Sequence, residues 1–150
     1  MIILNAKQSD LDEILEIEEE SFSEPWSKSG MEFEIDSDDA YVPIVRDKGE
    51  MFGYLVLHCF GDEAELFRVA VRKKYRNMKI ATKLLISAKK FAQRNGIEKI
   101  FLEVRQSNIN AIKLYTSGGF EKLGVRKNYY ENPKEDAIIM VCNTGRGEGK

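Results

Sequence analysis

Hydrophobic and polar residues alternate through the middle of the chain in a pattern that predicts a strand, a helix, a second strand and a second helix. Leu66–Val71 is strand-like and leads into a basic turn. A stripe of apolar residues with helical spacing then runs through about Lys79–Asn95, and Gly96 ends it. Ile97–Val104 is almost entirely apolar, and Asn108–Ser117 again has helical spacing. Such a strand–turn–helix–strand unit presents backbone N–H groups and a helix N-terminus to a phosphate.

The residues before this unit predict one short strand and two helices. The strand is Ile2–Asn5, and the second helix extends from Ser27 to about Asp36. Ser9 and Asp12 have the spacing of a capping box at the start of the first helix. One side of that helix is apolar, with Leu11, Ile14, Leu15 and Phe22. Its other side is acidic, which is typical of a solvated face, and carries Asp10, Asp12, Glu13, Glu16, Glu18, Glu19 and Glu20.

The remaining strands give the fold class. Tyr41–Arg46, Met51–Phe60 and Ala64–Val71 predict an antiparallel meander, and Phe120–Val125 and Ala137–Cys142 predict two final strands joined by a long polar loop. The order β-α-α-β-β-β-α-β-α-β-β predicts an α/β (α+β) fold with a mixed central sheet of about seven strands and about four flanking helices. We expect a single domain over residues 1–142 and a disordered polar tail over residues 143–150.

Composition narrows the class of protein. The chain has 150 residues, the length of one domain, with 43% hydrophobic residues and a net charge of −2. This balance is not that of a nucleic-acid-binding protein. The N-terminus lacks the pattern of a signal peptide, and no stretch approaches the roughly 20 apolar residues of a membrane span. We therefore expect a cytoplasmic protein with neither nucleic acid nor membrane as a partner.

The few cysteine and histidine residues disfavour thiol and metal chemistry. Cys59 and Cys142 each end an apolar run and are expected to be buried, reduced thiols. The single histidine, His58, is the neighbour of Cys59 in a predicted strand, so the two side chains point to opposite faces. We expect neither a Cys–His nucleophile nor a metal site.

The turn after the central strand is strongly basic. Cations are unfavourable at a helix N-terminus, so their density there favours a negatively charged ligand such as a phosphate. The alternatives are a solvated basic loop and a nucleic-acid contact, although Tyr75 is the one aromatic residue in the cluster. Six of the twelve residues from Arg72 to Lys83 are basic: Arg72, Lys73, Lys74, Arg76, Lys79 and Lys83.

Candidate catalytic and binding residues follow the basic turn in the sequence. Glu103 shares one face of its strand with Phe101 and Arg105. It is either a base at an opening in the sheet or a member of a charge pair with Arg105 or a neighbouring strand. Asn108 and Tyr115 are seven residues apart and share a helix face. They are either a helix cap and a core residue, or a binding residue and a general acid.

Aromatic residues in predicted loops are candidates for substrate contacts. Trp26 follows Pro25 in the connection between the first two helices, where a core plug and a pocket wall are both reasonable interpretations. Tyr129 and Tyr130 are adjacent in the predicted loop before the last strand, so one of them must face outward. The pair could form a clamp beside Trp26.

In their order and spacing, these features resemble the GNAT superfamily of acetyl-CoA-dependent N-acetyltransferases. Within it, the chain is similar to the RimI/Ard1-type branch of N-terminal protein acetyltransferases. The resemblance extends from about Ile2 to Cys142. Its motifs are Pro25-Trp26-Ser27, Phe67-Arg68-Val69-Ala70-Val71, the Tyr75–Leu85 turn and helix start, Leu102-Glu103-Val104-Arg105, Ser107-Asn108-x-x-Ala111, Leu114-Tyr115-x-x-Gly118-Gly119-Phe120 and Arg126-Lys127-Asn128-Tyr129-Tyr130.

The resemblance implies an enzyme that transfers acetyl from acetyl-CoA to the α-amine of a protein N-terminus by direct attack in a ternary complex. Ribosomal proteins are among the substrates it implies, and the enzyme is expected to be a monomer or small homo-oligomer. Glu103 would be the base, Tyr115 the acid, and Trp26 and Tyr130 would border the substrate. The implied cofactor-binding residues are Val69, Ala70, Val71, Arg76, Asn77, Met78, Lys79, Ile80, Ala81, Thr82 and Asn108.

One residue departs from the family pattern. At this turn the family has Arg or Gln, two residues, Gly, one residue, and then Gly or Ala. Here Lys79 takes the place of the first glycine, and either points away from the phosphates or places its ammonium on one. Two alternative functions remain: a lysine or small-molecule amine acetyltransferase, and a weakly active acetyl-CoA-binding module.

Overall fold

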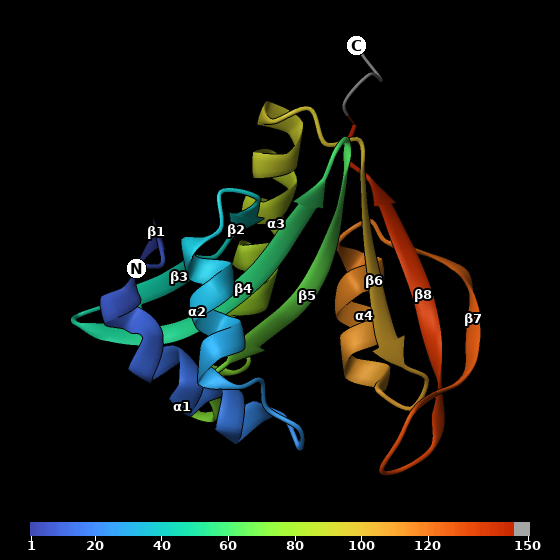
Figure 1. Cartoon of the computed structure of the whole chain (residues 1–150), viewed down its shortest axis with the longest axis horizontal. Coiled ribbons are helices and arrows are strands. Elements are labelled where there is room, and N and C mark those ends of the chain that lie inside the picture. Colours follow the sequence, from blue (N-terminus) through green and yellow to red (C-terminus); the bar gives the residue numbers. More distant parts are fainter. Residues whose placement is uncertain (146–150) are drawn as a thin grey trace.

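One mixed sheet runs through the molecule in the strand order β1-β3-β4-β5-β6-β8-β7, with the short β2 paired to β4 (Figure 1). This computed structural model describes residues 1–145. The eight strands of this part of the chain are β1 (Ile2–Asn5), β2 (Ala40–Tyr41), β3 (Pro43–Asp47), β4 (Glu50–Phe60), β5 (Glu63–Val71), β6 (Lys99–Arg105), β7 (Glu121–Tyr130) and β8 (Glu135–Asn143). Its four α-helices are α1 (Leu11–Ser21), α2 (Lys28–Asp36), α3 (Ile80–Arg94) and α4 (Ile109–Ser117). The predicted mixed α/β fold is confirmed, with one strand more than expected.

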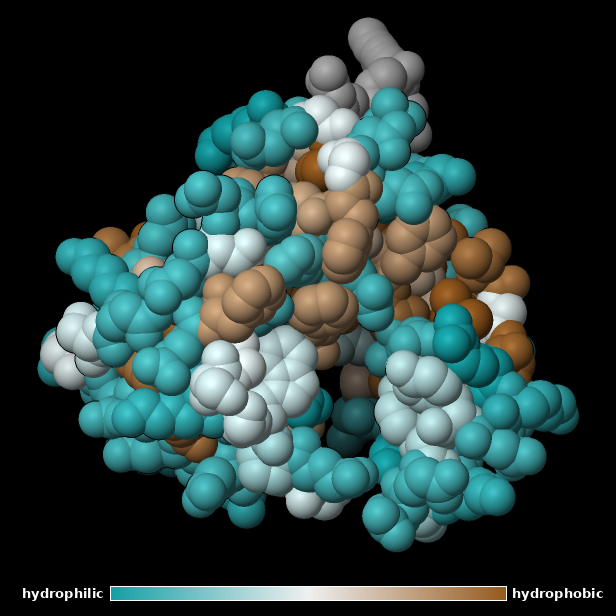
Figure 2. Space-filling view, viewed as in Figure 1, coloured by the Kyte–Doolittle hydropathy of each residue, from teal (hydrophilic) through white to brown (hydrophobic). Residues whose placement is uncertain are grey.

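The sheet is antiparallel except where β5 meets β6. These two strands are parallel, as the βαβ pattern predicts, but they pair over three residues each, Glu63–Glu65 with Lys99–Phe101. Beyond Glu65 they diverge, and Figure 1 shows the widening separation with α4 behind it. Figure 2 shows a deep hollow in the molecular surface at this place.

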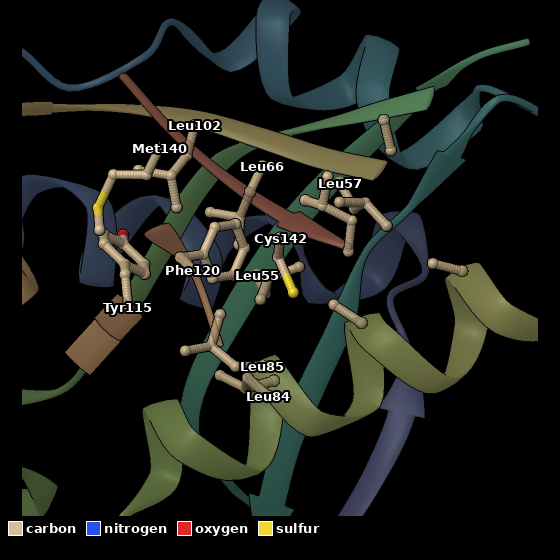
Figure 3. Packing of buried hydrophobic residues seen from close by; sticks show 14 of the residues in the cluster. Leu55, Leu57, Leu66, Leu84, Leu85, Leu102, Tyr115, Phe120, Met140 and Cys142 are labelled. Atoms are coloured by element: carbon tan, nitrogen blue, oxygen red, sulfur yellow. The ribbon is translucent and has the colours of Figure 1, made fainter. Parts of the chain in front are cut away.

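Two hydrophobic cores lie on opposite faces of the sheet. Leu55 and Leu57 of β4 point into the larger core, against α3, α4, β6 and β8. Tyr54 and Val56 alternate with them and point into the smaller core under α1 and α2. Figure 3 shows the larger core. The period-2 pattern of β4 therefore accounts for helices on both faces of the sheet.

Helix ends follow local capping signals. Ser27 caps α2 by accepting the Gly30 N–H at 3.1 Å. Gly96, at φ 75°, follows the end of α3, as predicted. The first helix begins differently from the prediction. The acidic residue of the capping box is Asp10 and not Asp12, and it accepts the N–H of Lys7 at 2.8 Å.

The acidic side of α1 is not simply a solvated face. Glu18 is fully buried and accepts hydrogen bonds from the Trp26 N–H, at 2.7 Å, and from the Tyr54 hydroxyl. Asp10 and Glu13 both bind the Arg46 guanidinium of β3. The acidic run therefore ties α1 to the sheet, and the prediction of solvation is wrong for these residues.

The last hairpin is tighter than predicted. β7 continues to Tyr130, five residues beyond the expected end, and β8 starts at Glu135, so the connection shrinks from the eleven residues 126–136 to the four residues 131–134. The register shifts between Arg126 and Tyr130, and Asn128 adopts φ 50° inside this irregular part of the strand. Edge-strand residues that are mostly exposed carry no hydrophobic alternation, which is why the pattern suggested a loop.

The C-terminal end of the folded part extends past residue 142. Asn143 is the last residue of β8, and Thr144 is buried, with its hydroxyl donating to the Ile97 carbonyl at 2.8 Å. Residues 146–150 of the predicted disordered tail lie outside the described residues. Within residues 1–145, no helix is both long and apolar enough to cross a membrane.

Candidate active site

A cavity of about 440 Å³ lies where β5 ends and α3 begins. Most of its wall comes from residues predicted to bind the cofactor: Val71, Arg76, Asn77, Lys79, Ile80, Ala81 and Thr82. The structure adds Tyr75 and Leu114, which sequence reasoning missed as site residues although both lie in the motifs of the resemblance. Val69, Ala70, Met78 and Asn108 do not line this cavity.

The turn that enters α3 contains two left-handed residues. Asn77 has φ 76° and Lys79 has φ 60° and ψ 29°. Lys79 is exposed and occupies the N-cap position of α3, with no side-chain cap. A left-handed backbone is the conformation that glycine adopts without strain and that other L-residues adopt at a cost. The position therefore has a backbone reason to be glycine, and Lys79 keeps that backbone.

The basic residues of the turn divide into two groups. Arg72 and Lys74 have acidic partners within the fold, because Arg72 lies 3.0 Å from Glu16 and Lys74 3.0 Å from Glu50. Within residues 1–145, Lys73, Lys79 and Lys83 form no ion pair. The prediction of a negative ligand therefore concerns the second group, for which it stays a prediction.

The helix N-terminus at the cavity favours an anion. The first N–H groups of a helix have no partner within it, and the first turn of α3 contains no acidic residue. Arg76 is held beside them, because its Nε donates to the Val71 carbonyl at 3.1 Å. The combination of orphan N–H groups and nearby cations is the chemistry of a phosphate site.

The free edge of β5 faces the opening in the sheet. Val69, Ala70 and Val71 pair with Leu55, Tyr54 and Gly53 of β4 on one side. Among residues 1–145, no β6 residue pairs with them on the other side. The cofactor-binding prediction for Val69 and Ala70 thus concerns an open strand edge and not the cavity wall.

Glu103 lies on β6 at the same opening, with 18% of its side chain exposed. Its Oε2 is 3.0 Å from Nε of Arg126 on β7, but the two groups are not aligned for a hydrogen bond, and this buried oxygen has no hydrogen-bond partner within the described residues. The predicted charge pair therefore exists with Arg126. Arg105 binds Glu135 instead, at 3.2 Å.

Tyr130 of β7 interacts electrostatically with Glu103, and Tyr115 of α4 interacts with Tyr130. Tyr115 is 8% exposed, and Figure 3 shows it next to Met140 at the edge of the larger core. Burial and the neighbouring Tyr130 raise the pKa of Tyr115 to about 12. Burial and the charge of Glu103 raise the pKa of Tyr130 to about 12 as well. Both phenols are therefore protonated at neutral pH and can donate.

Trp26 lies on the α1–α2 connection, across the opening from these residues. The Arg68 guanidinium of β5 is 5.1 Å from the centre of the Trp26 ring and 4.0 Å from that of Phe22. Arg68 also acts electrostatically on Tyr130, so it interacts with both predicted substrate contacts. A second cavity, of about 350 Å³, is lined by Trp26, Ser27, Gly30, Phe33, Glu34 and Phe67.

Two further predicted residues have structural contacts. Asn108 caps α4 by accepting the Ala111 N–H at 3.2 Å. Tyr129 is 44% exposed and packs edge-to-face on Tyr130, with ring centres 5.0 Å apart. The pair lies in β7 and not in a loop, and the outward-facing member is Tyr129. Within residues 1–145, no group of three His, Cys, Asp or Glu side chains is placed to hold a metal ion.

Comparison with known proteins gives the same picture. The family described as Acetyltransferase (GNAT) family matches residues 11–120. A putative ribosomal protein bS18-alanine N-acetyltransferase of Bacillus subtilis is 32% identical over 139 residues, 92% of each chain. The ribosomal protein bS18-alanine N-acetyltransferase of Escherichia coli K12 is 33% identical over 142 residues, 93% of this chain and 95% of that one. The crystal structure of the ribosomal-protein-S18-alanine N-acetyltransferase from Escherichia coli has a TM-score of 0.89 at 30% identity, covering 95% of this chain and 93% of that one.

A mixed sheet that opens between β5 and β6, with a helix N-terminus at the opening, is the fold of an acetyl-CoA-dependent N-acetyltransferase. The chain belongs to the acetyltransferase (GNAT) family. The resemblance found in the sequence motifs is therefore confirmed over nearly the whole folded chain.

Proposed function

We propose that this enzyme transfers acetyl from acetyl-CoA to the α-amine of a protein N-terminus, and that ribosomal protein bS18 is its substrate. The names of the relatives from Bacillus subtilis and Escherichia coli support the choice of substrate. One structural observation supports the choice of chemistry: at the opening between β5 and β6, Glu103 acts electrostatically on Tyr130, and Tyr130 acts on the buried Tyr115.

The residues of the cavity suit the co-substrate. The pyrophosphate of acetyl-CoA would lie at the N-terminus of α3, against the N–H groups of Ile80, Ala81 and Thr82 and the side chains of Arg76 and Lys79. The free edge of β5 at Val69–Val71 would hold the pantetheine by strand-like hydrogen bonds. Asn108, which caps α4, is proposed as a further contact through the part of its amide that the cap leaves free.

Glu103 and Tyr115 would perform the two proton transfers. Acetyl-CoA supplies an activated thioester carbonyl. Glu103 would accept a proton from the substrate ammonium, directly or through a water molecule, so that the free amine can form the new C–N bond. Tyr115 would donate its proton to the sulfur as the C–S bond breaks, and the second proton that the nitrogen releases as the amide forms would return Tyr115 to the neutral phenol. The raised pKa of Tyr115 keeps the phenol proton in place at neutral pH until a thiolate develops.

The free energy of deprotonation favours an α-amine as substrate. An α-amine has a pKa of about 7.7–8.0 and a lysine side chain about 10.4, so deprotonation at pH 7 costs about 1.4 and 4.6 kcal/mol respectively. One carboxylate on β6 meets the smaller demand more easily. Trp26 and Tyr130, which both interact with Arg68, would border the first residues of the substrate.

Two alternative functions predict different results in an acetylation assay. A lysine or small-molecule amine acetyltransferase would use the same co-substrate site. A weakly active acetyl-CoA-binding module is suggested by Lys79, which replaces the family glycine at the cavity. We place the enzyme in the cytoplasm, where ribosomal proteins are made, as a monomer or small homo-oligomer.

The test is an acetylation assay with acetyl-CoA, the N-terminal peptide of bS18, other N-terminal peptides, free lysine and polyamines. We expect mass increases of one acetyl group on the α-amine of the bS18 peptide. Transfer to lysine or polyamines without transfer to α-amines would contradict the proposal, and tight acetyl-CoA binding without turnover would favour the module. Glu103→Gln and Tyr115→Phe should each lower kcat by about 10²–10⁴-fold, the usual contribution of a general base or acid. Unchanged rates would remove the two roles and leave the substrate class standing.

A further inference from the structure

A second carboxylate, Glu65, lies at the point where β5 and β6 separate. It is the last β5 residue paired to β6, opposite Phe101, and its β4 partner is His58. Residues paired across neighbouring strands point to the same face of a sheet, and residues two apart along a strand share that face. Glu65 therefore shares one face with His58, Phe101 and Glu103.

The surroundings of Glu65 are half-buried and contain an excess of negative charge. Burial and the charge of Glu103 raise the pKa of Glu65, while Arg126 and His58 act in the opposite direction. Glu65 has no hydrogen bond or ion pair with any of residues 1–145, whereas His58 is held by Glu34 at 2.7 Å and Arg126 by Glu103. Two carboxylates here share one guanidinium.

One more positive charge would be favourable beside these two carboxylates. A partly desolvated carboxylate beside a like charge is unfavourable unless a cation joins it. An ammonium group carries three N–H donors and can bind two carboxylates at once. A protein N-terminus that approaches Glu103 for deprotonation brings such a group to this face of the sheet.

We propose that Glu65 is a second carboxylate of the amine site and binds the α-ammonium of the incoming N-terminus together with Glu103. The proposal rests on the proposed function, because it requires an α-amine at Glu103. Glu65 positions the charged form of the substrate, and Glu103 takes the proton. Recognition by Glu65 therefore distinguishes the substrate from its acetylated product, which has no charge.

The test compares the binding of two peptides to the enzyme saturated with coenzyme A, which allows no turnover. One peptide is an N-terminal substrate peptide with a neutral second residue, and the other is its N-acetylated form. Glu65→Gln should weaken binding of the free-amine peptide about tenfold, the effect of one hydrogen bond to a charged group, and leave the acetylated peptide unchanged. Glu65→Asp should recover part of the loss, because it keeps the charge.

Glu63→Gln is the matched control, since Glu63 is on the same strand but fully at the surface. It should bind both peptides as the wild-type enzyme does. Equal binding of the free-amine peptide by wild type and Glu65→Gln, or an equal loss for both peptides, would overturn the proposal. So would a loss seen with a basic second residue but not with a neutral one, because Glu65 would then contact that side chain. If the wild-type enzyme acetylates no α-amine, the proposed function fails instead.

Discussion

Lys79 adopts a left-handed backbone conformation that is unfavourable for a residue with a Cβ. Its φ of 60° is the value for which glycine is usually selected, and Asn77, two residues earlier, is also left-handed. Asparagine tolerates this region better than lysine does. The turn thus keeps its shape while Lys79 adds a cation at the cavity that we propose for the phosphates.

Lys79→Gly should therefore stabilise the protein, by up to about 1 kcal/mol, because the left-handed strain is larger than the chain entropy that glycine adds to the unfolded state. Urea unfolding followed by circular dichroism measures the change. Lys79→Ala is the matched variant: it removes the same charge but keeps a Cβ, and it should show no gain. If alanine stabilises as much as glycine does, charge and not backbone strain is the cause. The Michaelis constant for acetyl-CoA should rise in both variants, since both lose the ammonium.

At the scale of elements, Glu18 connects the parts that hold Trp26 in place. The carboxylate extends from α1 and binds the Trp26 N–H of the α1–α2 connection and the Tyr54 hydroxyl of β4. Arg68 Nε of β5 lies 3.5 Å from it. Three elements therefore meet at one buried anion, and its neutral and charged partners together compensate its desolvation.

Tyr54→Phe should lower the free energy of unfolding by about 1–3 kcal/mol, because it leaves an oxygen of a fully buried carboxylate without a donor. Burial and the charge of Glu18 raise the pKa of Tyr54 well above its usual value, so the wild-type hydroxyl remains a donor at any working pH. Tyr41→Phe is the control, since that hydroxyl binds the neutral hydroxyl of Ser87. We expect it to cost less than Tyr54→Phe in the same urea titration. Equal losses would show that the charge of Glu18 is unimportant.

Elements with a clear hydrophobic pattern could be predicted from the sequence, including the edge strand β1, whereas the extent of the irregular edge strand β7 could not. The alternation in β4 and the stripe of α3 placed these elements within about two residues. β7 was predicted too short, because its residues from Arg126 to Asn128 are polar and the strand is irregular there. The prediction that Glu103 and Leu102 point to opposite faces of their strand was correct. The ion-pair partner of Glu103 could not be predicted, because Arg126 lies two strands away in the sheet and is not marked by any local sequence pattern.

At the scale of the whole molecule, the acidic cluster and the basic cluster of the sequence bind each other. The acidic run of α1 and the basic turn after β5 were interpreted separately, one as solvated and the other as a ligand site. In the fold, Glu16 pairs with Arg72, and Glu20 accepts the Lys73 N–H at 2.6 Å. Pairing over more than 50 residues has no signature in one sequence. It positions α1 against the basic turn at which we propose the cofactor site begins.

This distribution of charge makes stability depend on pH. Hydrogen bonds from Arg46 and Met51 lower the pKa of Glu13, those from Tyr75 and Lys74 lower that of Glu50, and those from Ser107 and Arg105 lower that of Glu135. A carboxylate with a lowered folded-state pKa stabilises the protein above its unfolded-state pKa, and this contribution is lost as pH falls. Glu65 acts in the opposite sense, because its pKa is raised and its contribution is lost as pH rises.

Three contributions of the first kind outnumber the one of the second, so the free energy of unfolding should fall as pH drops below about 4.5, the model-compound value of glutamate. Urea titrations between pH 3 and pH 7 measure it. Glu13→Gln should be destabilised at pH 7, and its difference from the wild type should shrink as pH falls, because the wild-type carboxylate then becomes protonated. Glu19→Gln, which changes an exposed glutamate of the same helix, should follow the wild-type curve at every pH. A constant offset of Glu13→Gln from pH 3 to pH 7 would show that its ion pair with Arg46 does not cause the acid sensitivity.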